Sequence, residues 1–236
     1  MLAENEHLEQ MGAGISMLVS DRHTFGTDAL LLARFAAPKM NAVACDFGTG
    51  CGVIPFYWLA NGLRRVFGVE LQAQAAALAA RSIEMNGLSD RFTLIEGDLR
   101  DADPKLRPGS FDLVTMNPPY TKQGAGIDSP DAARRLQRQE TATLPEIASA
   151  ANRLLRFGGS FCLCLRPERL AEAICVLTDA DLAPKRLRLV SKTDGAAPWL
   201  FLLEGKKGRR HGLVVEPELH IYGADGQQGN YGTVTD

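Results

Sequence analysis

The feature that most constrains the fold is a repeated alternation of short apolar runs with longer stretches of helical pattern. The apolar runs span residues 42–46, 65–70, 92–96, 111–116, 160–165, 186–190 and 200–204, and the helical stretches span 53–60, 72–86, 144–156 and 168–180. Strands that alternate with helices of this length form a parallel sheet with both faces covered. The sequence therefore predicts an α/β fold with a mostly parallel seven-stranded sheet and helices on both faces.

The composition is that of an ordinary globular domain, with 45% hydrophobic residues, 23% charged residues and a formal net charge of −2. The apolar segment 29–37 is interrupted by Arg34, so no stretch is long enough to span a membrane. The five cysteines are odd in number and form no C-x-x-C pair, which favours reduced thiols and a cytoplasmic protein. The four histidines form no metal-ligand pattern, so we expect no metal.

We expect one domain at residues 41–222, preceded by an extension and followed by a tail. The extension at 1–40 should pack on the core and contains a short helix at 27–35. The tail at 223–236 is rich in glycine and glutamine and should be flexible. The sequence does not predict the oligomeric state.

A glycine-rich loop follows the first strand. Asp46 opens the pattern D-x-G-x-G-x-G, with Gly48, Gly50 and Gly52 at alternate positions. Glycines without Cβ atoms allow a cofactor to lie against the backbone. Glu70 ends the next strand, where a carboxylate can accept hydrogen bonds from ribose hydroxyls. This pair suits NAD as well as other nucleoside cofactors, and such a loop can also simply connect a strand to a helix.

Asp98 follows the third strand, in the sequence Glu-Gly-Asp-Leu. Its carboxylate can accept a hydrogen bond from the amino group of an adenine ring. An aspartate in this place is more often a turn or cap residue, so its position beside the other loops is what makes it a candidate.

The tetrapeptide Asn117-Pro118-Pro119-Tyr120 follows the fourth strand and is the most specific motif in the chain. Two prolines make the exit from the sheet stiff. The Asn117 side-chain oxygen and the Pro118 carbonyl can both accept from one planar amino group, which leaves the nitrogen lone pair free to attack a carbon. Tyr120 offers a face for stacking on a planar substrate. A rigid turn with a packed tyrosine is the alternative.

Together these motifs resemble those of the class I S-adenosylmethionine-dependent methyltransferases that modify exocyclic or amide nitrogens, which have a Rossmann-like domain. More narrowly, the segments at 25–33, 135–144 and 166–170 resemble the bacterial tRNA1(Val) adenine-N6 methyltransferases. The resemblance covers about residues 20–220 and implies methylation of the adenine just 3′ of the anticodon.

The resemblance also implies roles for individual residues. The residues expected to bind S-adenosylmethionine are Thr27, Asp28, Asp46, Gly48, Gly50, Gly52, Glu70, Asp98 and Asn117. Within this set, Glu70 would hold the ribose and Asp98 the adenine, and the glycine loop would surround the methionine part. The residues expected to hold the target base are Asn117, Pro118, Pro119 and Tyr120. The amino nitrogen would then attack the methyl carbon in line, the bond from that carbon to the sulfonium sulfur would break, and the nitrogen would lose a proton as it gains the methyl group. Orientation would supply most of the acceleration.

Binding of tRNA should require local positive charge, because the net charge of the chain supplies none. The candidate RNA-binding residues are Arg134, Arg135, Arg138, Lys206, Lys207, Arg209 and Arg210. The segment 206–210 is equally typical of an exposed hairpin turn. Cys51 lies within the glycine loop, where its thiol is either reactive or merely adjacent.

Other functions remain open on the sequence alone. Protein glutamine N5-methylation could use the same tetrapeptide, but the chain has no substantial separate N-terminal helical domain. Another RNA, such as rRNA, could supply the amino group. DNA adenine methylation is less favoured because no recognition domain is evident. A nucleotide-binding module of the dehydrogenase type would bind NAD instead of S-adenosylmethionine.

Overall fold

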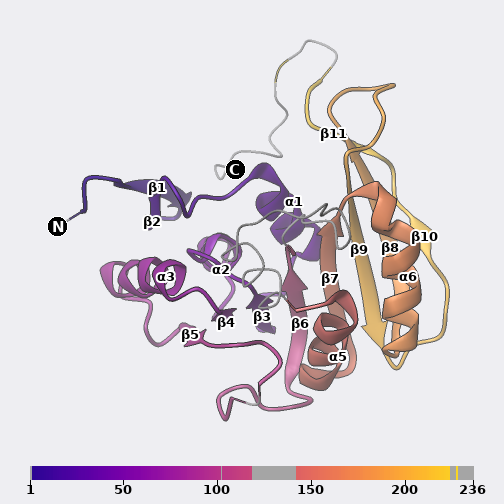
Figure 1. Cartoon of the computed structure of the whole chain (residues 1–236), viewed down its shortest axis with the longest axis horizontal. Coiled ribbons are helices and arrows are strands. Elements are labelled where there is room, and N and C mark those ends of the chain that lie inside the picture. The colour runs from indigo at the N-terminus through magenta and orange to yellow at the C-terminus, as the bar shows by residue number, and fades with distance from the viewer. Residues whose placement is uncertain (1, 102, 119–141, 224–226, 228–236) are drawn as a thin grey trace, which may run out of the picture.

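A computed structural model of the protein describes residues 2–101, 103–118, 142–223 and 227 (Figure 1). Its elements are β1 (Glu6–Gly12), β2 (Ile15–Ser20), α1 (Thr27–Ala36), β3 (Val43–Phe47), α2 (Val53–Ala60), β4 (Arg65–Glu70), α3 (Ala73–Met85), β5 (Phe92–Glu96), β6 (Phe111–Met116), α5 (Leu144–Leu154), β7 (Leu155–Leu165), a 3-10 turn (Pro167–Arg169), α6 (Leu170–Asp179), β8 (Leu182–Ser191), β9 (Leu200–Lys207), β10 (Val214–Val215) and β11 (Leu219–His220).

The main sheet has the strand order β10-β8-β9-β7-β6-β3-β4-β5, and β11 also pairs with β8. Strands β7, β6, β3, β4 and β5 are parallel, whereas β9 is antiparallel to both β7 and β8. The seven long strands confirm the expected α/β sheet. The two-residue strands β10 and β11 add to it beside β8 and have too few residues to show a strand pattern in the sequence.

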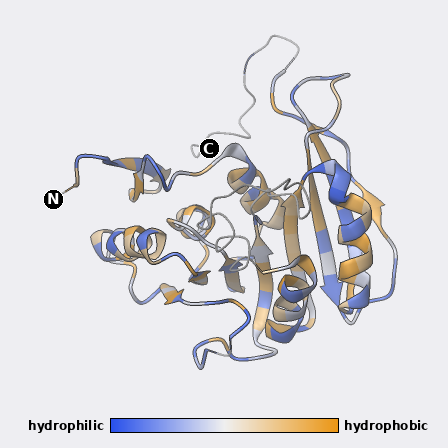
Figure 2. Ribbon diagram, viewed as in Figure 1, coloured by the Kyte–Doolittle hydropathy of each residue, from blue (hydrophilic) through white to orange (hydrophobic). Residues whose placement is uncertain are grey.

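Each face of the sheet has its own apolar cluster. One cluster contains buried residues of α1, α2 and α3, such as Leu32 and Phe56, and the other contains buried residues of α5 and α6, such as Ile147 and Leu177. The flanking helices therefore show both hydrophobic and hydrophilic stretches (Figure 2). No helix within the described segments combines the length and the apolar character needed to cross a membrane.

The N-terminal extension contains a hairpin that the sequence analysis does not predict. Strands β1 and β2 pair antiparallel, and the turn between them has positive φ angles at Gly12, Ala13 and Gly14. The hairpin packs beside α3, because the Leu18 amide donates to Ser82 Oγ at 2.8 Å. The polar sequence of β1 explains the omission, since Met11 is its only buried residue. The predicted helix at 27–35 is confirmed as α1.

Several predicted boundaries are wrong, since β7 begins at Leu155 and not at 160, and β8 begins at Leu182 and not at 186. Gly158 and Gly159 lie within β7, and the helix predicted at 144–156 stops at Leu154. A Cβ on Gly159 would meet the Phe111 carbonyl oxygen at 3.0 Å, so glycine permits an irregular, close pairing with β6. Strand β9 continues to Lys207, so Lys206 and Lys207 belong to a strand and not to a turn.

Candidate active site

The carboxyl ends of β3, β4, β5 and β6 meet along one edge of the sheet. Phe47 of β3 pairs with Val69 of β4 and with Met116 of β6, and Glu70 pairs with Glu96 of β5. The loops that follow these strands therefore emerge side by side, as ligand-binding loops do in open parallel sheets. We call this the carboxyl edge. Every candidate residue that directly follows or ends one of these strands lies there.

The glycine loop adopts a backbone that other residues resist. Gly48, Gly50 and Gly52 have φ angles of 60°, 59° and 94°, all in the left-handed region. A Cβ on Gly52 would come within 2.9 Å of the Phe56 ring, whereas a Cβ on Gly50 would meet no atom of the described residues within 4 Å. Glycine is thus required for packing at position 52, while no described residue packs against the Cα of Gly50.

Asp46 is buried beneath this loop, with 2% of its surface exposed. The Thr115 hydroxyl donates to Asp46 Oδ1 at 2.7 Å, which joins β6 to β3. Burial raises the pKa of the Asp46 carboxyl to about 7, the negative charge of Glu70 adds to this, and the hydrogen bond from Thr115 opposes it. The loop therefore lies over a carboxyl group that gains its charge near neutral pH.

Glu70 binds the glycine loop directly. Its Oε2 accepts from the Gly50 amide at 2.6 Å, and its Oε1 accepts from the Gln72 amide at 2.8 Å. Each carboxylate oxygen still has a lone pair, because an ionised carboxylate can accept about four hydrogen bonds. Glu70 can therefore brace the loop and accept from ligand hydroxyls at the same time. Leu71, which follows it, is 46% exposed and adds an apolar surface.

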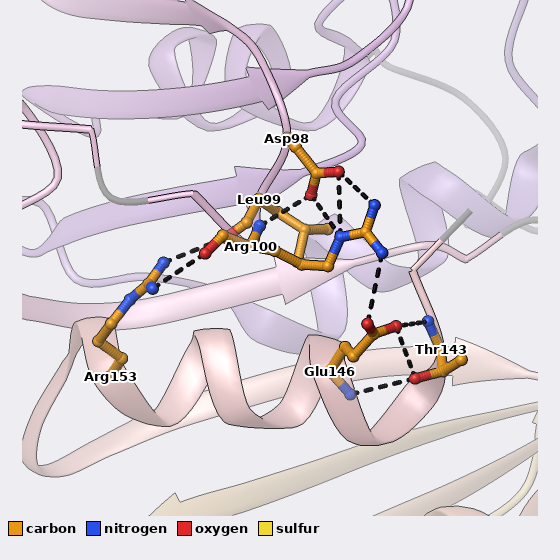
Figure 3. A network of polar contacts seen from close by, with 6 residues as sticks. All are labelled: Asp98, Leu99, Arg100, Thr143, Glu146 and Arg153. Atoms are coloured by element: carbon orange, nitrogen blue, oxygen red, sulfur yellow. Dashed lines mark hydrogen bonds and ion pairs between the residues drawn. The ribbon is translucent and has the colours of Figure 1, made fainter. Parts of the chain in front are cut away.

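Asp98 is held by an arginine from its own loop. Arg100 Nε donates to both carboxylate oxygens of Asp98, at 2.9 and 3.0 Å. These hydrogen bonds lower the pKa of Asp98, so its carboxylate stays ionised and can only accept. Arg100 also contacts Glu146 at 3.3 Å, where Glu146 and Thr143 cap the first turn of α5 (Figure 3). The loop after β5 is thereby tied to the start of α5.

Asn117 directly follows β6 and is half-buried, and Pro118 beside it is buried. The Cys164 thiol of β7 donates to Asn117 Oδ1, with 3.1 Å between sulfur and oxygen. Pro119 and Tyr120, the other two residues of the predicted base clamp, lie outside the described residues.

Thr27 and Asp28 begin α1, and Asp28 Oδ1 accepts from the Ala29 amide at 3.0 Å. The last turn of α1 lines a pocket with Asp112 and Gly159, which lie near the amino ends of the core strands. A ten-residue helix is about 15 Å long, so the start of α1 lies about this far from that pocket. The role of Thr27 and Asp28 in cofactor binding stays a prediction.

The basic segment at 206–210 lies at the opposite edge. Strand β9 is antiparallel to β7, so Lys206 pairs with Ser160 near the beginning of the core strands. The Lys207 ammonium donates to the Asn152 and Leu155 carbonyl oxygens at 2.6 and 2.9 Å, which caps α5. Arg209 and Arg210 are exposed, and Arg209 stacks on Phe157. Arg134, Arg135 and Arg138 lie outside the described residues.

All five cysteines carry free thiols. Burial raises the pKa of the Cys51 thiol to about 11, so it is protonated at neutral pH and a poor nucleophile. The alternative of a reactive Cys51 is therefore disfavoured. Within the described segments no group of three or more histidine, cysteine or acidic side chains is placed to hold a metal ion.

The structure also adds residues that sequence reasoning did not select, namely Thr115, Arg100 and Cys164. Each contacts a candidate residue: Thr115 contacts Asp46, Arg100 contacts Asp98, and Cys164 contacts Asn117. Two of these pairs join neighbouring strands, so strand order and register were the information needed to find them.

Comparison with solved structures supports the fold. The chain matches a predicted O-methyltransferase, protein Atu636 from Agrobacterium tumefaciens, with a TM-score of 0.65 and 23% identity, over 84% of this chain and 88% of that one. At this identity the likeness concerns the fold alone.

Comparison by sequence is more specific. Two curated relatives carry the name tRNA1(Val) (adenine(37)-N6)-methyltransferase. The protein from Aeromonas salmonicida is 32% identical over 66% of this chain and 65% of its own length, slightly under two thirds. The protein from Porphyromonas gingivalis is 30% identical over 76% of this chain and 72% of its own. The family model described as "Methyltransferase small domain" matches residues 19–175. The chain therefore belongs to the methyltransferase small domain family, and within it to the group that includes these two relatives.

Proposed function

We propose that this protein transfers a methyl group from S-adenosylmethionine to the exocyclic N6 of an adenine in tRNA, at the anticodon-loop position named for its relatives. The observation that best supports this proposal is the hydrogen bond from Thr115 to Asp46, which joins β6 to β3. It fixes β6, which ends just before Asn117, beside β3, which leads into the glycine loop. A candidate base-binding residue and a candidate cofactor loop are thus neighbours on one rigid edge.

The residues at this edge fit a nucleoside cofactor with a positive charge. No described residue packs against the Cα of Gly50, where a ligand would lie against the backbone. Glu70 retains acceptor capacity for ribose hydroxyls. Asp98 is an ionised acceptor whose oxygens already accept four hydrogen bonds from Arg100, so an adenine amino group would have to replace one of these. Asp46 supplies negative charge below the loop once it ionises. Gly48, Gly52, Thr27, Asp28 and Asn117 complete the proposed set.

The proposed chemistry needs little from the protein beyond placement. When bound, S-adenosylmethionine supplies an electrophilic methyl group on a positively charged sulfur. Asn117 Oδ1 and the Pro118 carbonyl would accept the two hydrogens of the adenine amino group, so that its lone pair points away from them. Orientation of this kind accounts for much of the acceleration in bimolecular transfers. Pro119 and Tyr120 belong to the proposal as the rest of the clamp.

RNA binding by Arg134, Arg135, Arg138, Lys206, Lys207, Arg209 and Arg210 remains part of the proposal. The exposed Arg209 and Arg210 are the better candidates within 206–210, because Lys207 already caps α5. Their place at the far edge would require the tRNA to extend over the molecule. Free thiols at all five cysteines support a reducing, cytoplasmic setting.

The direct test is incubation with labelled methyl donor and total tRNA, followed by mass spectrometry of the nucleosides. We expect N6-methyladenosine in tRNA. Label that appears only in rRNA, or only in glutamine residues of added protein, would assign the reaction to an alternative acceptor. Binding of NAD without response to S-adenosylmethionine, measured by calorimetry, would reject the methyltransferase.

The buried carboxyl of Asp46 predicts a pH-dependent stability. Its pKa is about 7 in the folded protein against an ordinary value of 3.8, so between these values the folded state holds a proton that the unfolded chain has released. The free energy of unfolding contributed by this group therefore falls as pH rises through that range. We expect Asp46→Asn to be more stable than the wild type at pH 8, by about 1–3 kcal/mol, and this gain should vanish near pH 4.

Thermal unfolding between pH 4 and pH 8 measures this, at roughly 2–4 °C per kcal/mol for a chain of this size. The exposed Asp90→Asn change is the control and should shift the midpoint little at any pH. S-adenosylmethionine should raise the melting temperature of the wild type more than that of Asp46→Asn, because the charge below the loop is lost in the variant. A stability difference that grows toward low pH would contradict the assignment.

A further inference from the structure

We infer that Cys164 is a positioning residue for the Asn117 side chain, an inference that rests on the proposed function. Asn117 follows the last residue of β6, and Met116 pairs with Leu163 of β7. The next position along each chain brings Asn117 beside Cys164. The two side chains meet there, with 3.1 Å between Cys164 Sγ and Asn117 Oδ1.

The direction of this hydrogen bond selects one orientation of the amide. A protonated thiol offers a hydrogen, and Cys164 is fully buried in an apolar cluster, where water does not compete for it. Its best partner is therefore the amide oxygen of Asn117 and not the amide nitrogen. A carbonyl oxygen has two lone pairs, so it can accept from two donors.

This orientation matters because an asparagine amide can rotate and exchange its oxygen and nitrogen ends. Only the oxygen end can accept a hydrogen from an adenine amino group. If the amide were reversed, its N–H groups would face the N–H groups of the adenine amino group, and no hydrogen bond could form. Cys164 holds the Asn117 oxygen in the accepting orientation before the substrate binds. The entropy of orienting this side chain is then not lost during the reaction.

A neighbouring cysteine provides a matched control. Cys162 lies two residues earlier on the same strand, is also fully buried in the same cluster, and pairs with Thr115 instead of Asn117. Cys164→Val and Cys162→Val both replace a thiol with an apolar side chain that is one heavy atom larger, so any cost of overpacking is common to the two variants. Cys164→Ser restores a hydroxyl donor at the position in question. Comparison of the three variants separates loss of the donor from disturbance of the core.

Steady-state kinetics with tRNA tests the inference. We expect Cys164→Val to lower kcat about three- to tenfold, the effect of losing one hydrogen bond. Its KM for S-adenosylmethionine should not change. Cys162→Val and Cys164→Ser should stay within about twofold of the wild type. In an Asn117→Ala background, Cys164→Val should cause no further loss, because it acts through the same side chain. Equal losses in both valine variants, or an undiminished kcat in Cys164→Val, would overturn the inference.

A second measurement does not depend on activity. The side-chain amide of Asn117 gives a pair of ¹⁵N–¹H signals, which disappear in Asn117→Asp and are thereby assigned. Cys164→Val should shift or split this pair, and Cys162→Val should not. If the wild type fails to methylate tRNA but the shift occurs, the proposed function fails and the positioning role stands. If tRNA is methylated and the NMR signals of the Asn117 amide do not shift in Cys164→Val, the positioning role is rejected and the proposed function stands.

Discussion

Asn117→Ala is expected to lower the rate of methyl transfer to tRNA by about a hundredfold to a thousandfold, the usual cost of removing one well-placed hydrogen-bonding group from a reaction site. The side chain lies at the end of β6, half-buried, with its oxygen in contact with the Cys164 thiol. Its removal takes away the oxygen proposed to accept from the target amino group. Single-turnover transfer of labelled methyl to tRNA measures the loss.

As a control, the affinity of Asn117→Ala for S-adenosylmethionine and its melting temperature are measured. Alanine is smaller than asparagine and leaves the β6 backbone pairing unaffected, so the melting temperature should change little. Asn117→Asp retains an acceptor oxygen at the same place and should be more active than Asn117→Ala. A folded Asn117→Ala protein that transfers methyl groups at the wild-type rate would remove Asn117 from the mechanism.

Much of the fold could be predicted because its strands are buried and sharply bounded. Strands β4, β5 and β6 have the bounds that the sequence predicts, ending in the acids Glu70 and Glu96 and just before Asn117. The hairpin β1–β2 could not be predicted in the same way. Its strands gain stability from contacts with α3 and the residue that follows it, about seventy residues away, and β1 itself is mostly polar with Met11 as its only buried residue.

The convergence of the candidate residues could also be predicted, because parallel strands present their carboxyl ends at one edge. Their partners could not. Strand β6 lies beside β3 and not beside β5, which precedes it in the chain, so the pairing of Thr115 with Asp46 depends on strand order. The same reason hides the contact between Cys164 and Asn117. Sequence motifs thus located the candidate residues, and register supplied the contacts that hold them.

For the basic segment at 206–210, the sequence shows the charge but not its place in the fold. Its charge is plain in the sequence, but charge alone does not reveal on which edge it lies. Because β9 is the antiparallel strand, the segment is carried to the amino ends of the core strands. The Lys207 ammonium then donates hydrogen bonds to the backbone carbonyl oxygens of Asn152 and Leu155. A lysine proposed to bind phosphate thus also makes a structural contact within the protein.

Glu70→Ala is expected to weaken binding of S-adenosylmethionine by about a hundredfold or more. The carboxylate has two tasks at the carboxyl edge, since it braces the loop through the Gly50 amide and is proposed to accept from the ribose hydroxyls. Hydrogen bonds to a charged group contribute roughly 1.5–3 kcal/mol each, so the loss of two reaches this size. Removal also leaves the Gly50 and Gln72 amides without their carboxylate partner. Titration calorimetry measures the change in Kd.

Glu96→Ala is the matched control, because Glu96 pairs with Glu70 in the next strand, ends at the same edge and is exposed. It should alter Kd by less than about twofold, since an exposed charge contributes little. Glu70→Gln separates the two tasks of the carboxylate. Its amide has one oxygen, so its NH2 group would face either the Gly50 or the Gln72 amide hydrogen, and binding should recover only in part. Full affinity in a folded Glu70→Ala protein would contradict the proposed cofactor site and leave the brace as the sole role of this residue.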